Sequence, residues 1–264
     1  MSGETLGRYV RKELTPLSPV TLTNEQVPAD LDEAYRLLFD AVRGDEHFGA
    51  AWKLGGTTAV TRRIFKVEKL YFGPLHASEI LVSPPVAPGR RLHEVKGEAE
   101  IALRIAPTAA TVIAAGEAAI AAAPAGTLFD AWSVALELPS SPITNLVDVG
   151  VTALVADRCA SGSLVLGPAT AYDGAHDWSG GKLRTEQDGV TIAEGGLEAL
   201  VAAPDVCGRD FLIEAVRHGF TPRPGAWIST GGITPCVGLT PGAAVVVFHD
   251  DEPVIRFQVG LGPA

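Results

Sequence analysis

The sequence predicts an α+β fold in which a small helical N-terminal portion packs on one β-rich domain. Apolar side chains recur at helical spacing in residues 1–45, whereas short apolar runs separated by Gly and Pro follow from Ala51 onward. A chain of 264 residues, 47% of them hydrophobic, can bury a full core. We therefore expect a helical portion over residues 1–50 and a β-rich domain over residues 51–264, which together form one compact unit.

The helical portion contains one strongly patterned helix. Asp30 is a suitable N-cap residue, because its side chain can accept a hydrogen bond from the free backbone N–H groups of the first turn. Gly44 is placed to end the helix, since glycine readily adopts the left-handed conformation common at helix C-termini. Between them the apolar residues repeat at helical spacing, at Leu31, Ala34, Tyr35, Leu38, Phe39 and Val42.

The β-rich domain is predicted from short apolar runs bounded by turn residues. Runs at residues 79–82, 146–151, 163–167 and 243–248 have the length of single strands. Two segments of helical character interrupt them, at residues 108–123 and 210–218, and Gly219 is the expected glycine after the second helix. The small alanines of the first segment would let that helix lie close to a sheet.

The charge and composition exclude several classes of function. The net charge is −10 and no basic cluster is larger than a pair of arginines, so a nucleic-acid partner is not expected. The N-terminus lacks an apolar signal segment, and the longest apolar stretch, residues 109–123, is too short to span a bilayer. We expect a cytoplasmic protein with no membrane partner.

Cysteine spacing and missing motifs give further exclusions. The three cysteines stand singly, without the CxxC spacing of thiolate zinc sites, which indicates a reducing compartment. Neither a G-x-S-x-G nucleophile elbow nor a P-loop occurs, so serine hydrolase and nucleoside triphosphatase functions are not expected.

Two glutamates on one strand are the most informative chemical feature. Apolar residues alternate with other side chains over residues 95–105, so Glu98 and Glu100 lie on the same strand face about 7 Å apart. Carboxylates this close repel each other, and a divalent cation between them would offset the repulsion. A third acid, Glu137, ends the apolar run at residues 131–137. From spacing alone, the pair either lines a solvated strand face or binds a metal.

Six short segments match the ordered motifs of one enzyme family. They are a K-x-G-x-T segment at residues 53–57, a Y-x-G-x-L turn at 71–75, an E-A-E strand at 98–100, an A-L-E segment at 135–137, an A-D-x-x-x-S-G loop at 156–162 and a T-G-G-x-T segment at 230–234. Each segment is a weak signal, but their order is specific. Together they resemble the fumarylacetoacetate hydrolase superfamily, in its branch of 2-keto-4-pentenoate hydratases and 4-oxalocrotonate decarboxylases.

The resemblance implies a twisted mixed β-sheet roll, like the C-terminal domain of fumarylacetoacetase, that holds one Mg²⁺ or Mn²⁺ on Glu98, Glu100 and Glu137. Oxygen ligands suit a hard cation, and three protein ligands leave open positions for a chelating 2-oxo acid substrate. A homo-oligomer is also implied, and association with a sister enzyme of the same pathway is left open.

Lys53 is the catalytic residue that the resemblance implies. The matching lysine of the family lies beside the substrate and transfers a proton, and a nearby dication would lower its pKa toward neutrality. From the sequence alone, Lys53 could instead be a surface lysine at the end of a strand.

Two loops are expected to bind the substrate. In the first loop an arginine replaces the usual asparagine, and it could bind a second substrate carboxylate or point to solvent. Glycines and hydroxyls also occur in ordinary turns, so this assignment comes from the resemblance. The expected substrate-binding residues are Arg158, Ser161, Gly162, Thr230 and Gly231.

The resemblance implies a metal-dependent hydratase that adds water to a 2-hydroxy-2,4-dienoate, or its 2-oxo-enoate tautomer, through a metal-stabilised enolate in aromatic-compound catabolism. The alternative is a decarboxylase of a 2-oxo-enedioate of the 4-oxalocrotonate type, which Arg158 and Gly232 in place of serine favour. A catalytically silent partner subunit is a third alternative, suggested by the loop departures, and the three glutamates and Lys53 weigh against it.

Overall fold

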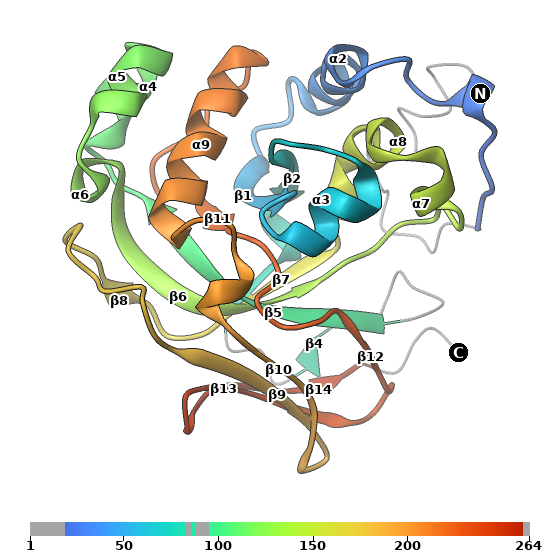
Figure 1. Ribbon diagram of the computed structural model, residues 1–264, viewed down its shortest axis with the longest axis vertical. Helices are drawn as coiled ribbons and strands as arrows, with labels where there is room; N and C mark the ends of the chain where they lie inside the picture. The colour runs from blue at the N-terminus through green and yellow to red at the C-terminus, as the bar shows by residue number, and fades with distance from the viewer. Residues whose placement is uncertain (1–18, 83–85, 88–94, 261–264) are drawn as a thin grey trace.

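The computed structural model describes residues 19–82, 86–87 and 95–260, which form two sheets with helices packed around them (Figure 1). The strands of the larger sheet are β1 (Phe48–Gly55), β2 (Tyr71–His76), β3 (Ile80–Val82), β5 (Val95–Ile105), β6 (Phe129–Leu138), β7 (Ser163–Leu166), β8 (Thr170–Ala171), β11 (Trp227–Ser229) and β12 (Val237–Leu239). Their order is β2-β1-β11-β5-β6-β7-β3, with β12 beside β5 and β8 beside β6.

The smaller sheet lies below the larger one in Figure 1. It consists of β4 (Val86–Ala87), β9 (Lys182–Gln187), β10 (Val190–Gly196), β13 (Ala244–His249) and β14 (Glu252–Val259), in the order β10-β9-β13-β14-β4. Both sheets combine parallel and antiparallel neighbours, since β1 runs parallel to β11 and β4 parallel to β14. The expected α+β fold with a mixed, curled sheet is confirmed.

The helices lie above the larger sheet in Figure 1. They are α2 (Leu31–Val42), α3 (Ala59–Phe65), α4 (Ala109–Ala114), α5 (Glu117–Ala122), α6 (Ala125–Leu128), α7 (Leu146–Val149), α8 (Val151–Ala156) and α9 (Pro204–Arg217), with 3-10 turns η1 (Asn24–Gln26), η2 (Ala77–Glu79), η3 (Arg158–Ala160) and η4 (Leu197–Ala199). Within the described ranges, none of these helices combines the length and apolar character that a membrane crossing requires.

Local sequence signals identified several elements correctly. The Asp30 side chain accepts a hydrogen bond from the backbone N–H of Glu33, so the expected N-cap of α2 is confirmed. The expected strands near residues 79–82, 163–167 and 243–248 correspond to β3, β7 and β13. Residues 1–18 of the expected helical portion lie outside the described residues, and β1 begins at Phe48, so it spans the boundary placed at residue 50.

Three expectations were wrong. The run at residues 146–151 forms the helices α7 and α8, because short apolar runs fit a buried helix as well as a strand. The segment at residues 108–123 is two helices, since Gly116 has a φ of +90° that interrupts the helix. Helix α9 begins at Pro204, with the proline in its first turn, and not near residue 210.

The larger sheet is rolled, because its two edge strands are close in sequence. The edge strand β2 continues through the three-residue turn η2 into β3, which is the opposite edge of the sheet. Residues that face each other across neighbouring strands point to the same side of a sheet. By this register the inner face carries a small buried cluster of Ala51, Leu75, Ala102, Ala135, Leu164 and Leu166.

The outer face of the roll carries the main core. There Trp52 packs against Phe72, Phe211 and Phe220, with ring centroids 5.2–5.8 Å apart. Three of the six residues in the inner cluster are alanines, and these small side chains help the sheet to curl, since the inner face of a roll has less room. The polar residues next to these alanines on the inner face are the candidates for catalysis and ligand binding.

Gly73 is required where the turn at Arg158 passes over β2. A Cβ atom at Gly73 would lie 2.1 Å from the carbonyl oxygen of Arg158, a backbone atom that cannot move aside. We expect Gly73→Ala to lower the free energy of unfolding by at least about 1–3 kcal/mol, the usual cost of overpacking. Urea denaturation measures this change. Gly238→Ala is the matched control, because a Cβ there meets no atom within 4 Å, and an equal loss in both variants would contradict this reading.

Candidate active site

Three glutamates lie on the inner face of the roll. Glu98 of β5 is directly opposite Glu137 of β6, and Glu100 is opposite Ala135 of the inner cluster. Glu100 and Glu137 are fully buried, whereas Glu98 is partly exposed. Glu98 and Glu100 lie on the same face of β5, as predicted. The alternative of a solvated strand face does not describe Glu100, which is 0% exposed.

Only one of the two carboxylate oxygens of Glu100 accepts hydrogen bonds from the described residues. Its Oε2 accepts hydrogen bonds from the hydroxyl of Ser229 at 2.5 Å and from the backbone N–H of Gly231 at 2.9 Å. Its Oε1 is buried and has no hydrogen-bond partner among the described residues. Burial, together with the charges of Glu98 and Glu137, raises the pKa of Glu100, while the two donors act in the opposite direction.

Lys53 is part of this cluster and is not a surface residue. It lies on the inner face of β1, is 9% exposed, and places its Nζ 2.9 Å from Oε2 of Glu137. Burial lowers the pKa of Lys53, but the carboxylates of Glu137, Glu98 and Glu100 raise it, and the net pKa lies above that of an ordinary lysine. The charged ammonium therefore offsets part of the acidic charge. The expected lowering of the Lys53 pKa does not occur with the carboxylates alone.

The donor set fits a hard divalent cation in chemistry, although the carboxylates are not gathered around one point. Carboxylate oxygens are the ligands that Mg²⁺ and Mn²⁺ prefer, and the unpartnered Oε1 of Glu100 can accept a cation. As the side chains stand, no three His, Cys, Asp or Glu residues within the described ranges are arranged to hold an ion. Metal binding would therefore require side-chain movement, for which the partly exposed Glu98 has the most freedom.

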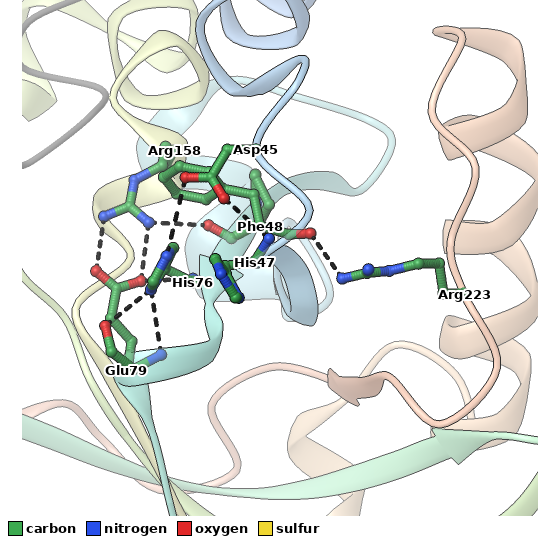
Figure 2. Close-up of polar contacts among 9 residues, drawn as sticks. Asp45, His47, Phe48, His76, Glu79, Arg158 and Arg223 are labelled. Atoms are coloured by element: carbon green, nitrogen blue, oxygen red, sulfur yellow. Dashed lines mark hydrogen bonds and ion pairs between the residues drawn. The ribbon is translucent and has the colours of Figure 1, made fainter.

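Arg158 has a partner within the protein. Figure 2 shows its guanidinium in a two-point ion pair with Glu79, with N–O distances of 2.8 and 2.9 Å. The same group donates to the carbonyl of Pro74 and lies over the ring of Phe48. Arg158 is 0% exposed. This arrangement does not support the expected contact of Arg158 with a substrate carboxylate, because both terminal nitrogens are already used.

The turn that contains Arg158 is strained. Arg158, Cys159 and Ala160 have φ values of +55°, +56° and +55°, a left-handed conformation that costs about 1–2 kcal/mol per residue for side chains other than glycine. The Ser161 hydroxyl donates to the carbonyl of Arg158 at 2.5 Å, so it stabilises this turn. Gly162 follows where a Cβ would lie 2.2 Å from the carbonyl of Leu138. Substrate binding by Ser161 and Gly162 stays a prediction.

The residues of the second expected substrate loop donate hydrogen bonds to β5. Both the N–H and the hydroxyl of Thr230 donate to the carbonyl of Ile101. Gly231 gives its N–H to Glu100 and has a φ of +116°, and a Cβ there would lie 1.8 Å from the hydroxyl of Thr57. In this structure these two residues support the glutamate strand, and substrate binding by Thr230 and Gly231 stays a prediction.

Two residues with clear roles were missed in the sequence. Ser229 directly precedes the recognised T-G-G-x-T segment, and its alternation with Trp227 on a short strand was an available signal. Glu79 had no local signal, because its partner Arg158 is 79 positions away. Only the closure of the roll brings these two residues together.

The pair of Glu79 and Arg158 should be energetically coupled. Arg158→Met leaves a buried carboxylate without its counter-charge and is expected to lower the free energy of unfolding by about 3–5 kcal/mol. Combining it with Glu79→Gln should recover part of this loss, because the uncompensated charge is then gone. Urea unfolding of the four proteins gives the coupling energy, and strictly additive losses would contradict it. Arg36→Met is the control, since that side chain is 68% exposed in its ion pair.

No family model and no curated protein matches this sequence. Solved structures do match it. The 4-oxalocrotonate decarboxylase from Pseudomonas putida G7, complexed with magnesium and adipate, has a TM-score of 0.79 at 18% identity over 97% of each chain. A fumarylacetoacetate hydrolase family protein from Yersinia pestis CO92 has a TM-score of 0.53 at 15% identity, over 80% of this chain and 93% of the other.

A third match is the 2-hydroxyhepta-2,4-diene-1,7-dioate isomerase from Mycobacterium marinum, with a TM-score of 0.54 at 15% identity over 80% of this chain and 73% of the other. The TM-scores show a shared fold, and at 15–18% identity the similarity extends to the fold alone. The chain has the fold of the fumarylacetoacetate hydrolase superfamily, as the ordered motifs implied, and it is similar along nearly its whole length to 4-oxalocrotonate decarboxylase.

Proposed function

We propose that this protein is a divalent-metal-dependent lyase that acts on a small 2-oxo acid. The observation that carries the proposal is that Glu98, Glu100 and Glu137 lie on the inner face of the roll together with Lys53, which contacts Glu137. The net reaction that we propose is the addition of water to a 2-hydroxy-2,4-dienoate or its 2-oxo-enoate tautomer, a step of aromatic-compound catabolism.

The three glutamates would hold Mg²⁺ or Mn²⁺, and the similar decarboxylase was solved with magnesium and with calcium. When bound, such an ion supplies electrostatic stabilisation of the negative charge that develops on the keto oxygen of the substrate. The burial of Glu100 and Glu137 strengthens this effect, because charges interact more strongly away from bulk water.

Lys53 supplies the proton transfer. Its Nζ is held 2.9 Å from Glu137, on the same inner face as the other two glutamates. From this position the ammonium can give a proton to the carbon skeleton of a bound 2-oxo acid, and the neutral amine can take one. The acid cluster fixes the direction of the side chain, which is a requirement for efficient transfer.

Decarboxylation is the second candidate reaction. It is favoured by the similarity of the fold to 4-oxalocrotonate decarboxylase over 97% of both chains. Arg158 had suggested a dicarboxylate substrate in the sequence, but its guanidinium is paired with Glu79, so this argument for decarboxylation is weakened. A silent partner subunit is disfavoured, because Lys53 and the three glutamates are all present and gathered on one face.

Product analysis separates these functions. Purified protein with Mg²⁺ and a 2-hydroxy-2,4-dienoate should consume the ultraviolet absorbance of the diene without releasing CO₂. Release of CO₂ from a 2-oxo-enedioate, with no turnover of the monocarboxylate, would replace the hydratase by the decarboxylase. Absence of both reactions would support the silent subunit.

Removal of one acid should abolish tight metal binding. We expect Glu100→Gln to weaken the affinity for Mn²⁺ strongly, since an amide carries no charge and two acids cannot complete the oxygen shell. Titration calorimetry measures the affinity. Glu194→Gln, at an exposed position of β10, serves as the charge-matched control. Equal affinity of Glu100→Gln and the wild type would remove Glu100 from the metal site.

Removal of the lysine should separate binding from turnover. Lys53→Met should bind Mn²⁺ at least as tightly as the wild type, because a competing cation next to Glu137 is lost. Turnover should fall by about 10²–10⁴-fold, the usual contribution of a positioned acid or base. Steady-state kinetics at saturating metal tests this loss, with exposed Lys182→Met as control. Near-normal turnover would show that Lys53 carries no proton.

A further inference from the structure

Ser229 occupies a place that none of the recognised motifs includes. It ends β11, which lies between β1 and β5, and it is the register partner of Lys53 on one side and of Ala102 on the other. Because register partners share a face, Ser229 points to the inner face of the roll together with the acids. It is 0% exposed.

The hydrogen bonds of Glu100 are unequal. Both Ser229 and Gly231 donate to Oε2, whereas Oε1 of the same buried carboxylate accepts no hydrogen bond from the described residues. A buried polar oxygen without a hydrogen-bond partner costs about 1–3 kcal/mol. Such an unsatisfied oxygen is tolerated where a bound ligand interacts with it. An oxygen with two further carboxylates on the same face is suited to bind a cation.

The two donors also fix the rotation of the carboxylate. The N–H of Gly231 comes from a backbone position that admits only glycine, since a Cβ would lie 1.8 Å from the hydroxyl of Thr57. Ser229 approaches the same oxygen from the neighbouring strand. With Oε2 held at two points, the plane of the Glu100 carboxylate is set, and Oε1 is the oxygen left for a ligand.

We propose that Ser229 is a positioning residue that holds Oε2 of Glu100, so that Oε1 is presented to the divalent cation. This assignment rests on the proposed metal-dependent function. Residues that orient a metal ligand without touching the metal typically contribute 10–100-fold to metal affinity. Ser229 therefore affects the affinity for the ion, whereas Lys53 affects the proton-transfer step.

The test compares two buried serines of the same face. Ser133 of β6 is also 0% exposed and faces Ala102, but its hydroxyl donates to the carbonyls of Val134 and Gly167 and to no carboxylate. Calorimetric titration with Mn²⁺ should show about 10–100-fold weaker binding by Ser229→Ala. Ser133→Ala should retain the wild-type affinity. With activity as a second readout, Ser229→Ala should need more metal for half-maximal rate and approach the wild-type kcat at saturating metal.

Each outcome is decisive. Wild-type affinity in Ser229→Ala, or equal losses in both serine variants, would overturn the positioning role. If Ser229→Ala does not fold, Ser229→Cys keeps the volume with a much weaker donor, and its wild-type affinity would overturn the role equally. Failure of the wild-type protein itself to bind Mn²⁺ would instead refute the metal-dependent function.

Discussion

The repulsion among three glutamates inside a rolled sheet is the constraint on which the rest of the structure depends. Glu98, Glu100 and Glu137 lie on one face because β5 and β6 pair in a register that places Glu98 opposite Glu137. Two of these carboxylates are fully buried, so water offsets little of their repulsion. Lys53 supplies a positive charge to Glu137, and the donors to Glu100 come from β11 and the residues after it.

The closure of the roll is a second requirement, and it is connected to the first. Glu79 lies in the turn between the two edge strands of the sheet, and Arg158 holds it with a two-point ion pair. The carbonyl of Arg158 lies directly over Gly73, the register partner of Lys53. The backbone of Arg158 therefore lies over β2, which is next to the strand of Lys53, and Ser229 is on the strand after that. The energy of this pair holds a left-handed turn that three non-glycine residues would otherwise avoid.

The contacts of each side chain in the cluster decide whether it can bind a cation or transfer a proton. Glu100 is fixed by neutral donors, which leave its charge available to a cation, whereas Glu137 is bound to an ammonium. The same charge that keeps Lys53 protonated would be shared with a metal, so ion binding and the basicity of the lysine are linked. Small residues such as Ala102 and Ala135 leave the inner face open enough for these long side chains.

The sequence by itself determined the strand alternation that places Glu98 and Glu100 on one face, the Asp30 cap of α2, and the ordered motifs that implied the fold. The first two features depend on neighbouring residues, whose geometry is fixed by the backbone period, and the third depends on the order of short segments along the chain. Tertiary structure alone decided that residues 146–156 are helical, that Arg158 pairs with Glu79, and that Ser229 holds Glu100 across 129 positions. Such contacts depend on how the sheet curls and closes, and no local pattern contains that information.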